Sequence, residues 1–266
     1  MITASTALYC VLGSPVVHSK SPLIHNAAFK DKGIDAVYLA FEPQTIEAAV
    51  QAIRTLGIQG ASVTIPFKES VIPHLDWIHP LAAKIGAVNT LVNENGVIKG
   101  YNTDCDAAVA PLLSHGIENK TICIVGAGGA ARAVAFGMVA HGARVMIANR
   151  TRQKAKALAK QIRGDFIPFE DMKNIQAEVV INTTSLGMVP DPKILSYPAQ
   201  ALHPGMVVMD VVYTPLDTCL LKTARKKKCV TIDGLSMFVA QAAAQFKLWT
   251  GIEPDQDLMR QTALTH

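Results

Sequence analysis

The sequence predicts an α/β fold in which strands and helices alternate along the chain and the sheet is largely parallel. The first seventy residues alternate apolar runs of strand length with segments of helical periodicity, in the order β-α-β-α-β. Residues 121–148 read as a strand, a glycine-rich turn, a helix and a second strand. Such alternation implies parallel strands joined by right-handed crossovers. The 266 residues suffice for one large or two moderate domains.

Composition is that of an ordinary globular protein. Half of the residues are hydrophobic and 17% are charged, which argues against disorder. The net charge of 25 − 21 = +4 is too small to indicate a nucleic-acid partner by itself. The one basic run, residues 225–228, is expected to be the solvated end of a helix, where cations are favoured.

Cysteine usage and the start of the chain bear on the compartment. The five cysteines show no C-x-x-C spacing, and Cys10 and Cys123 sit in apolar runs, which is typical of buried thiols in a reducing compartment. The first residues lack a basic n-region and an apolar core, and no apolar run approaches ~18 residues. We therefore expect a cytoplasmic protein without a signal peptide or a membrane span.

The first strand is expected at residues 8–12, followed by a helix from Ser21 to about Lys32. Ser21 is expected to be the N-cap, because a proline follows it at the first helical position. Ser19 and Ser21 then stand at a helix N-terminus, where backbone N–H groups and the helix dipole favour an anion. Two hydroxyls there suit a polyhydroxylated carboxylate, although both serines could serve only to cap the helix.

The next expected elements are a strand at 37–41, a helix at 46–56 and a strand at 61–65. Pro66 ends the last strand because it cannot donate to a sheet. Lys68 therefore lies just beyond the carboxyl end of a strand, where open α/β sheets keep their ligand sites. Taken alone, Lys68 is expected to be a solvated surface lysine, because lysines are mostly exposed, and the case against this rests on the other residues.

A hairpin is expected from residues 88–92 and 97–101, because an Asn-Gly pair lies between these two apolar runs. Asn89 places an amide inside an apolar strand, where it needs hydrogen-bond partners or a ligand. Asp104 begins a helical stretch that runs to about Ser114, and the helix dipole there favours an ionised carboxylate. Capping alone would also account for Asp104.

The glycine-rich turn after the strand at 121–125 matches G-x-G-x-x-A. Gly126 permits the tight turn, Gly128 lets the backbone approach a pyrophosphate, and Ala131 allows close packing of helix and strand. A helix to about residue 141 and a strand at 144–148 follow, so the context predicts dinucleotide binding.

The end of that second strand bears on the choice of dinucleotide. An acidic residue there would hold the ribose 2′-hydroxyl of NAD. The chain instead has Asn149-Arg150-Thr151-Arg152, with Lys154 soon after, and this cationic segment favours the 2′-phosphate of NADP.

Further strands are expected at 178–182, 206–212 and 229–232. The first ends in a small polar loop, residues 182–188, the second in Tyr213-Thr214-Pro215 and the third at Asp233-Gly234. An apolar helix at 235–249 carries Gln241 and Gln245, and a polar tail follows it. No histidine lies in metal-ligand spacing with another histidine or cysteine, and His18 and His25 are expected to be structural.

Together these segments resemble those of the shikimate dehydrogenase family, the shikimate:NADP oxidoreductases of aromatic biosynthesis. The resemblance covers nearly the whole chain in order. The segments that carry it are 13–15, 18–26, 63–68, 86–90, 102–104, 126–132, 149–151, 182–184, 187–188, Tyr213, Pro215 and Gln241.

The resemblance implies an N-terminal α/β substrate-binding domain, residues 1–103 and 235–266, and a Rossmann-type NADP-binding domain, residues 104–234, with a cleft between them. Lys68 and Asp104 match the catalytic pair. Positions that match contacts to the shikimate carboxylate and hydroxyls are Ser19, Ser21, Thr64, Lys68, Asn89, Asp104, Tyr213 and Gln241. Positions that match the NADP site are Gly126, Ala127, Gly128, Gly129, Ala130, Asn149, Arg150, Thr151, Lys154, Thr183, Gly187, Met188, Val211, Gly234 and Met237.

The implied reaction is the reversible NADPH-dependent reduction of 3-dehydroshikimate to shikimate, with Lys68 as general acid/base and Asp104 as its partner. No metal is needed for it and no metal-ligand cluster is visible. The expected partner is a small-molecule substrate, not a nucleic acid or a membrane, and the chain is expected to be a monomer or homodimer.

Three positions depart from the usual family pattern: Ser62 in place of Asn, Ala107 in place of Gly, and Ser236 in place of Gly. They leave open a quinate/shikimate dehydrogenase that uses NAD or both cofactors. A non-catalytic NADP- or shikimate-binding sensor is a further alternative, and the intact Lys68 and Asp104 argue against it.

Overall fold

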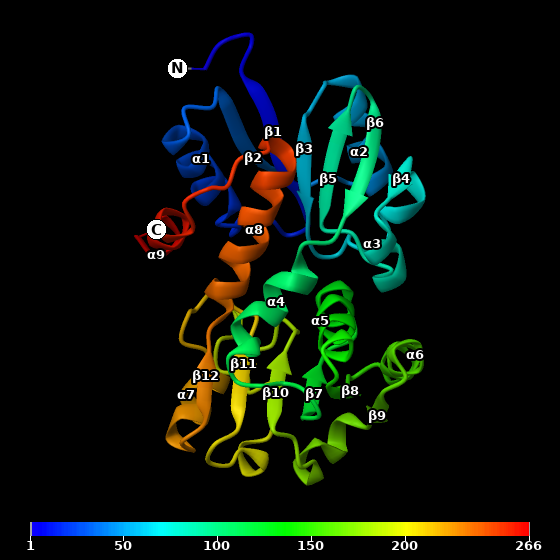
Figure 1. The fold of residues 1–266 in the computed structure, drawn as a ribbon, viewed down its shortest axis with the longest axis vertical. Coiled ribbons are helices and arrows are strands. Elements are labelled where there is room, and N and C mark those ends of the chain that lie inside the picture. The colour runs from blue at the N-terminus through cyan, green and yellow to red at the C-terminus, as the bar shows by residue number, and fades with distance from the viewer. Residues whose placement is uncertain (1, 266) are drawn as a thin grey trace. The chain divides into compact units, whose positions relative to one another are not determined.

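The computed structural model describes residues 2–265, which form two compact units (Figure 1). Unit 1 runs to Thr103 and takes in the chain from Val239 onward, and unit 2 is the continuous segment Asp104–Phe238. Each unit contains one six-stranded sheet. No helix within residues 2–265 is long and apolar enough to cross a membrane.

The sheet of unit 1 is mixed, with the strand order β2-β1-β3-β5-β6-β4. Only β5 runs against its neighbours, so β1, β2, β3, β6 and β4 all point the same way. The hairpin between β5 and β6 turns at Asn95 and Gly96, whose φ angles of 54° and 90° are the left-handed values that a two-residue hairpin turn requires. The strands are β1 (Ala7–Leu12), β2 (Ala36–Phe41), β3 (Gly60–Val63), β4 (Trp77–Ile78), β5 (Thr90–Glu94) and β6 (Val97–Tyr101).

The helices of unit 1 are α1 (Ser21–Asp31), α2 (Ile46–Thr55), α3 (Pro80–Ile85), α9 (Gln256–Thr265) and most of α8 (Gly234–Thr250). A short 3₁₀ helix covers Ile72–His74. The polar tail expected after residue 249 is in fact largely α9, which packs against α1. Met259 and Ala263, four residues apart, are its buried side chains, and so short an apolar stripe gives little signal in the sequence.

An aromatic cluster and a glycine tie α8 to the sheet of unit 1. The Trp249 ring lies 5.2 Å from Tyr9, and its Nε1 donates to the Leu91 carbonyl at 2.9 Å. A Cβ on Gly60 would stand 2.4 Å from that Nε1. The absence of a side chain at Gly60 therefore lets α8 approach the sheet closely.

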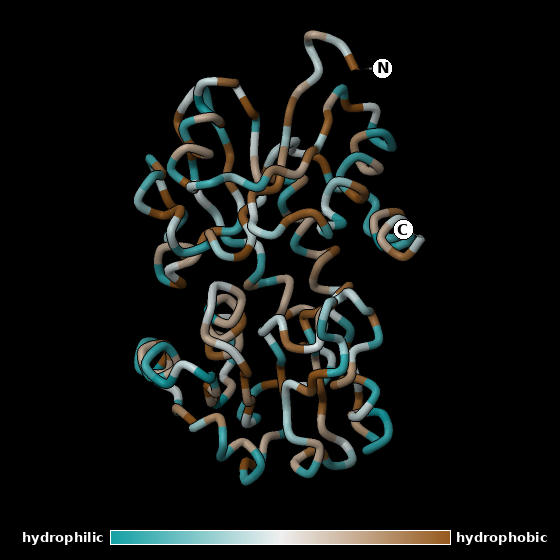
Figure 2. Tube along the Cα trace, turned by 180° about the vertical axis from the view of Figure 1, so that it is seen from behind, coloured by the Kyte–Doolittle hydropathy of each residue, from teal (hydrophilic) through white to brown (hydrophobic). Residues whose placement is uncertain are grey.

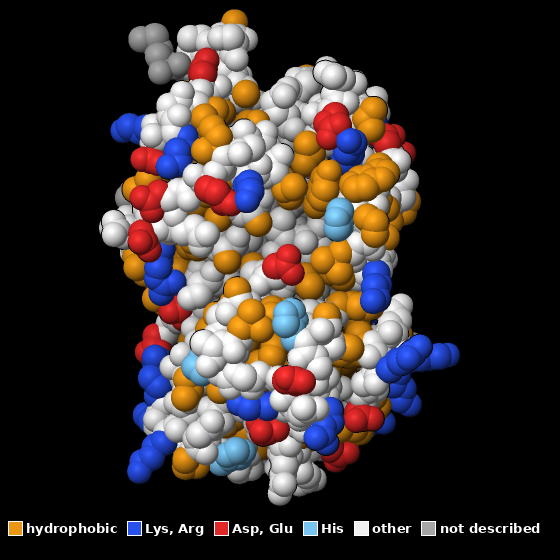
Figure 3. Space-filling model, in the orientation of Figure 1, with side chains coloured by type: hydrophobic (Ala, Val, Ile, Leu, Met, Phe, Trp, Pro, Cys, Tyr) orange, Lys and Arg blue, Asp and Glu red, His pale blue; other side chains and the backbone are white. Residues whose placement is uncertain are grey.

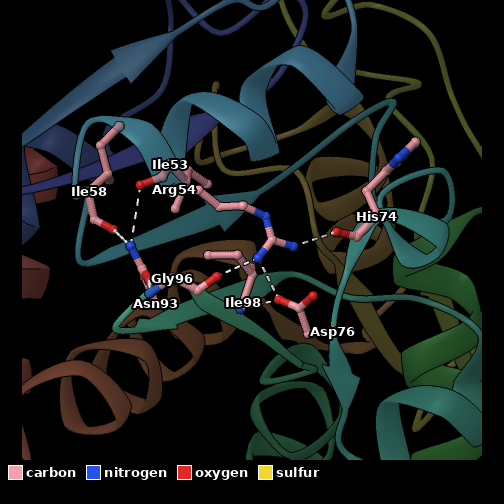
Figure 4. Close-up of polar contacts among 8 residues, drawn as sticks. All are labelled: Ile53, Arg54, Ile58, His74, Asp76, Asn93, Gly96 and Ile98. Carbon is pink, nitrogen blue, oxygen red and sulfur yellow. Dashed lines mark hydrogen bonds and ion pairs between the residues drawn. The ribbon is translucent and has the colours of Figure 1, made fainter.

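The tip of the β5–β6 hairpin is held by polar side chains (Figure 4). Arg54, at the end of α2, donates to the Gly96 and His74 carbonyls and pairs with Asp76 at 2.6 Å. Asp76 also accepts from the Ile98 backbone N–H at 2.7 Å. The Arg54 hydrogen bond and the Ile98 N–H lower the pKa of Asp76, so its carboxylate stays ionised at neutral pH.

The sheet of unit 2 is entirely parallel, with the order β12-β11-β10-β7-β8-β9. In the order of the chain this is the 3-2-1-4-5-6 arrangement of a doubly wound dinucleotide-binding fold, and its strand order reverses between β7 and β10. The strands are β7 (Thr121–Val125), β8 (Arg144–Ala148), β9 (Asp165–Ile167), β10 (Val179–Asn182), β11 (Val207–Asp210) and β12 (Val230–Ile232). The connecting elements are α4 (Asp104–Leu113), α5 (Gly129–Ala140), α6 (Arg152–Ile162), α7 (Cys219–Lys226) and 3₁₀ helices at Phe169–Asn174 and Ala199–Ala201.

Right-handed crossovers that wind outward in both directions from β7 and β10 place α5 and α6 on one face of this sheet and α7 on the other. The buried cores are apolar: Val180, Val208 and Leu221 belong to unit 2, and Val50, Leu91 and Ile98 to unit 1. Figure 2 shows hydrophobic stretches within each unit and hydrophilic stretches in its outer loops. On the face drawn in Figure 3, positive and negative side chains are interspersed over both units.

Two expectations about unit 1 are wrong in detail. Strand β3 ends at Val63, not Ile65, although the Thr64 N–H still donates to the Leu12 carbonyl at 2.9 Å. Helix α1 begins at Ser21 itself, with Lys20 in the N-cap position and no side-chain cap. Ser21 thus lies in the first turn and is followed by Pro22. The Ser21 N–H donates to Ser19 Oγ at 3.3 Å.

Candidate active site

Three loops of unit 1 meet at one edge of its sheet. The Ser14 N–H donates to the Ile65 carbonyl at 2.9 Å, and the Val88 N–H donates to the Lys68 carbonyl at 2.8 Å. This follows from topology, because β1 and β3 are parallel and end at the edge where the antiparallel β5 begins. We call residues 13–21, 64–68 and 87–89 the edge loops of unit 1.

The first of these loops carries Ser19 and Ser21. Gly13 allows it to pass close to the next loop, since a Cβ there would stand 2.4 Å from the Thr64 methyl group. Ser19 is half-buried and Ser21 is buried at the start of α1. The structure therefore brings Ser19, Ser21 and Thr64 to the same edge of the sheet, beside a helix N-terminus.

Asn89 is buried, and its amide is engaged within the protein. Its Oδ1 accepts from the Thr103 N–H and from Thr90 Oγ1, both at 2.8 Å, and its Nδ2 donates to Thr103 Oγ1 at 2.9 Å. These bonds fix Thr103, the last residue of unit 1 before the chain enters unit 2. Asn89 still has a second amide hydrogen for a ligand.

Gln245 of α8 joins this set from 156 residues away. Its Nε2 donates to the Asn89 carbonyl at 3.0 Å and to Thr90 Oγ1 at 3.1 Å. Its Oε1 accepts from Ser62 Oγ at 2.7 Å, and Ser62 accepts from the Tyr38 hydroxyl at 2.6 Å. Gln241 lies one turn earlier on the same face of α8, since residues four apart share a helix face.

All members of this hydrogen-bonded set are uncharged, and we call the set the neutral network. It consists of Tyr38, Ser62, Gln245, Thr90, Asn89 and Thr103. His25 stacks on Tyr38 with ring centroids 4.4 Å apart and is fully buried. Burial lowers the pKa of His25 to about 3, so the ring is uncharged at neutral pH, in keeping with its expected structural role. Burial also raises the pKa of Tyr38 well above its ordinary value.

Lys68 and Asp104 are placed by the elements that precede them. Lys68 is half-buried in the loop after β3. Asp104 is buried and is the first residue of α4, where the helix dipole favours its charge. Because Asp104 follows Thr103 directly in the chain, the Asn89–Thr103 hydrogen bonds fix its point of attachment.

The turn between β7 and α5 has the geometry expected of a phosphate loop. Gly126 has a φ of 126°, and a Cβ there would stand 2.3 Å from Thr183 Oγ1, so this position requires glycine. Gly128 is exposed at the N-cap of α5, and a Cβ there would point into open space, with no atom of residues 2–265 within 4 Å beyond the adjoining residues. The open backbone and the free N–H groups of the helix start fit a pyrophosphate.

The segment after β8 is cationic and exposed. Thr151 is the N-cap of α6, and the Asn149 amide donates to its carbonyl at 3.2 Å. Arg150 and Lys154 are exposed, whereas Arg152 pairs with Glu170. Their position at the carboxyl end of the strand next to β7 fits the 2′-phosphate of NADP.

The other residues expected at the NADP site lie on loops of unit 2. Thr183, Gly187 and Met188 follow β10, and Val211 follows β11. Gly234 begins α8 and Met237 lies in its first turn. All fifteen candidate NADP residues thus belong to unit 2, and the individual roles of these and of the substrate residues stay predictions.

Tyr213 stacks on Phe238 with ring centroids 4.4 Å apart. Burial raises its pKa to about 12, so its hydroxyl keeps its proton at neutral pH. No group of three or more His, Cys, Asp or Glu side chains among residues 2–265 is arranged to hold a metal ion.

The sequence did not predict that buried polar groups hold these loops. Ser62 and Gln245 stood out only by residue type, and Thr90 and Asn182 only as parts of longer segments, whereas Asp210 was not singled out. All five are buried and hydrogen-bonded within their units. For Asp210 a signal was available, because a carboxyl in a run of buried apolar residues needs partners. No pattern pairs Ser62 with a residue 183 positions later.

A doubly wound parallel sheet with a glycine turn after its first strand defines unit 2 as a Rossmann-type dinucleotide-binding unit, typical of oxidoreductases. Three family models match the chain: the shikimate dehydrogenase substrate-binding domain over residues 11–91, shikimate/quinate 5-dehydrogenase over 109–193, and the shikimate 5′-dehydrogenase C-terminal domain over 234–264.

Relatives extend over nearly the whole chain. A shikimate dehydrogenase (NADP(+)) of Moorella thermoacetica is 45% identical over 95% of this chain and 90% of its own. One of Pyrococcus furiosus is 44% identical over 99% and 97%. The chain belongs to the shikimate dehydrogenase family.

Solved structures agree with this assignment. The shikimate 5-dehydrogenase of Thermus thermophilus in complex with NADP(H) and shikimate has a TM-score of 0.89 and 36% identity, over 97% of this chain and 99% of that one. A quinate dehydrogenase of Corynebacterium glutamicum in complex with NAD has a TM-score of 0.90 and 31% identity, over 98% and 99%. The same fold therefore serves more than one substrate and cofactor.

Proposed function

We propose that the protein is an NADP-dependent shikimate dehydrogenase that interconverts 3-dehydroshikimate and shikimate. The observation that carries this proposal is the meeting of Ser19, Thr64, Lys68 and Asn89 at one edge of the sheet of unit 1. These are two hydroxyls, a cation and an amide, the groups that a polyhydroxylated carboxylate needs. Near-full-length identity to curated NADP-dependent shikimate dehydrogenases supports it.

Unit 1 is proposed to bind the substrate and unit 2 the cofactor. NADP supplies or accepts a hydride when it is bound. The exposed Gly128 backbone and the N-terminus of α5 would hold its pyrophosphate, and Arg150 and Lys154 its 2′-phosphate. Asn149, in place of a carboxylate, avoids repulsion of that phosphate.

Lys68 is proposed as the general acid. Negative charge grows on the ketone oxygen of 3-dehydroshikimate during reduction, and the Lys68 ammonium can meet this charge and donate the proton. In the reverse direction neutral Lys68 accepts the proton from the hydroxyl. Asp104 is proposed to orient the ammonium and to accept a hydrogen bond from a substrate hydroxyl.

Steady-state rates with shikimate and quinate, each with NADP⁺ and NAD⁺, test the proposal. We expect the highest kcat/KM for shikimate with NADP⁺. A preference for quinate with NAD⁺ would instead support the quinate dehydrogenase alternative. Two observations motivate that alternative: the likeness to the Corynebacterium glutamicum enzyme and the departure from the family pattern at Ser62. Binding of shikimate and NADP⁺ without turnover would favour the sensor.

The role of Lys68 has its own test. We expect Lys68→Ala to lower kcat by roughly 10²-fold or more, with shikimate binding largely kept, in line with acid–base contributions. Lys99→Ala is the matched control, because Lys99 pairs with Glu94 on the exposed hairpin of the same unit. Wild-type turnover of Lys68→Ala would remove Lys68 from the mechanism.

Two further assignments belong to the proposal. The five cysteines, all within the described residues, form no disulfide bond, which fits a cytoplasmic location, and fractionation of cells that express the chain tests it. The protein is proposed to act as a monomer or homodimer, and light scattering coupled to size exclusion measures which of the two forms is present.

A further inference from the structure

Unit 2 contains a buried carboxyl group that the proposed chemistry does not use. Asp210 is the last residue of β11 and has no exposed surface. Burying a carboxylate is costly unless hydrogen bonds compensate for lost water. The partners of Asp210 therefore indicate what its charge holds in place.

Asp210 accepts three hydrogen bonds. Its Oδ1 accepts from Asn182 Nδ2 at 2.8 Å and from the Val212 N–H at 3.0 Å, and its Oδ2 accepts from Thr218 Oγ1 at 2.8 Å. Asn182 is the residue of β10 directly opposite Asp210 in the parallel register. Asp210 thus connects the loop after β10, the loop after β11 and the N-cap of α7, which Thr218 forms.

Asn182 links Asp210 to the loop after β10 through hydrogen bonds. Its Oδ1 accepts from the Thr184 N–H at 3.1 Å and from Thr184 Oγ1 at 2.7 Å, and its Nδ2 also donates to the Leu186 carbonyl at 3.2 Å. The amide therefore bonds to both sides of the turn at residues 183–186. Asp210 in turn fixes the orientation of that amide, because it accepts from Nδ2.

The loop after β10 lies against the phosphate loop. The Thr183 N–H and Oγ1 donate to the Val125 carbonyl at 2.9 and 2.7 Å, and Thr183 occupies the space that a side chain on Gly126 would need. The strand order of the sheet reverses between β7 and β10. Doubly wound sheets bind their ligands at this reversal, beyond the carboxyl ends of the strands.

We propose that Asp210 is a positioning residue for the dinucleotide: through Asn182 and Val212, its carboxylate holds the loops after β10 and β11 in the conformation that binds NADP. This inference rests on the proposed function. It assigns a role to a residue that would not touch the cofactor.

The ionised form of Asp210 is the one that fits its surroundings. All three partners donate, and two of them are the N–H groups of Asn182 and Val212, which cannot accept a hydrogen bond. Burial raises the pKa of Asp210 to about 6 from 3.8, while hydrogen bonds from Thr218, Val212 and Asn182 oppose that rise. Protonation is therefore reached on mild acidification, and it would place an O–H among donors.

Charged groups on the neighbouring elements have other partners or face solvent. Asp217 pairs with Arg225 on the surface, and Asp233, after β12, accepts from the Ser236 N–H at 3.1 Å. Lys222 of α7 is exposed. We therefore expect NADP affinity to decrease as pH falls through about 6, because Asp210 then gains a proton.

The first test measures Kd for NADP⁺ and for shikimate separately at pH 7.5, by calorimetry. We expect Asp210→Ala to weaken NADP⁺ binding roughly 10-fold or more, as for loss of hydrogen bonds to a charged group, and to leave shikimate binding within about twofold. Asn182→Ala should weaken NADP⁺ binding similarly, and the double variant should be no weaker than the more affected single one, because both act through one connection.

The control is Tyr197→Phe, which removes another buried polar group of unit 2. The Tyr197 hydroxyl has no hydrogen-bond partner among the described residues, and we expect unchanged NADP⁺ affinity. NADP⁺ affinity of Asp210→Ala within twofold of wild type, or equal weakening by Tyr197→Phe, would overturn the inference. Failure of the wild-type protein to bind NADP⁺ would instead overturn the proposed function.

The second test uses Asp210→Asn, which keeps the shape and mimics the protonated side chain. We expect it to bind NADP⁺ roughly fivefold more weakly than wild type at pH 7.5 and equally at pH 5, since charged acceptors bind more strongly than neutral ones. The 2′-phosphate also titrates near pH 6, and the ratio of the two Kd values removes that shared effect. A ratio that stays constant from pH 5 to 7.5 would mean that the charge of Asp210 has no part in positioning.

Discussion

The two units hold their candidate ligand loops by different means. Unit 1 uses the neutral network, in which amides and hydroxyls from β2, β3, β5 and α8 bond to one another. Unit 2 uses one buried carboxylate, Asp210, bonded to residues from three segments. A neutral network keeps its hydrogen bonds across a wide range of pH, whereas a buried carboxylate is sensitive to pH and costs stability when it is ionised.

The difference matters because the two proposed ligands differ. The proposed substrate would find Lys68 and serine hydroxyls at the edge of the sheet, so unit 1 needs no buried charge to hold its loops. The cofactor brings phosphates, and a carboxylate beside the phosphate loop would repel them if it were exposed. Asp210 avoids this by lying behind the loop and acting through Asn182.

The largest expected effect on stability comes from Gln245→Leu. It removes Gln245 as one of the buried partners of the Asn89 carbonyl and of the Ser62 and Thr90 hydroxyls, and should lower the free energy of unfolding by about 3 kcal/mol. Urea unfolding at pH 5 and pH 7.5 checks this. The loss should be equal at both pH values, because His25, with a pKa of about 3, and Tyr38 stay neutral throughout. A loss confined to one pH would break the contrast between the units.

Asp210→Asn should change stability in a way that depends on pH. A carboxyl whose pKa is raised on folding contributes stability below its unfolded pKa of 3.8 and loses it as pH rises through about 6. The free energy of unfolding of the variant should therefore rise relative to wild type between pH 4 and pH 7, by roughly 2 kcal/mol. Parallel stability profiles for the two proteins would contradict this expectation.

Ser62→Ala should have a smaller effect on the neutral network. It removes the acceptor for the Tyr38 hydroxyl and the donor to Gln245, at a cost of about 1–2 kcal/mol. Gln245 keeps its bonds to Asn89 and Thr90, so shikimate KM should change less than in Gln245→Leu. Equal changes in shikimate KM for the two variants would show that Gln245 acts only through its bond to Ser62, so that Ser62 fixes the loop at Asn89.

The smallest effect is expected for Tyr197→Phe, within about 1 kcal/mol of wild type. Its hydroxyl is buried without a partner among the described residues, so its removal gives up no hydrogen bond. Thermal unfolding measures the change. A large loss of stability would mean that a buried hydroxyl contributes to the stability of unit 2 even without a hydrogen bond.

The sequence predicted best what local patterns encode. The strand at 121–125, the glycine turn and the strand at 144–148 lie where they were expected, because each combines an apolar run with a turn residue that the geometry requires. Gly126 shows why, since no other residue fits its φ and the nearby Thr183. The two-residue turn at Asn95-Gly96 was likewise predicted from the Asn-Gly pair.

Sequence reasoning failed where tertiary contacts decide. Strand β4 has two residues and forms only because β6 offers it a partner. The run at 206–212 reads as one strand, and only the structure shows that β11 stops at Asp210 and turns its carboxyl group toward Asn182. The neutral network joins residues up to 183 positions apart, and periodicity carries no such information.

Helix α8 has a consequence for the order in which the protein is completed. It begins in unit 2 and continues into unit 1, where it supplies Gln245 and Trp249. A ribosome finishes all of unit 2 before it makes these residues. During that interval the sheet of unit 1 has the Leu91 and Asn89 carbonyls without their partners from α8, so the unit that is begun first is the one that is finished last.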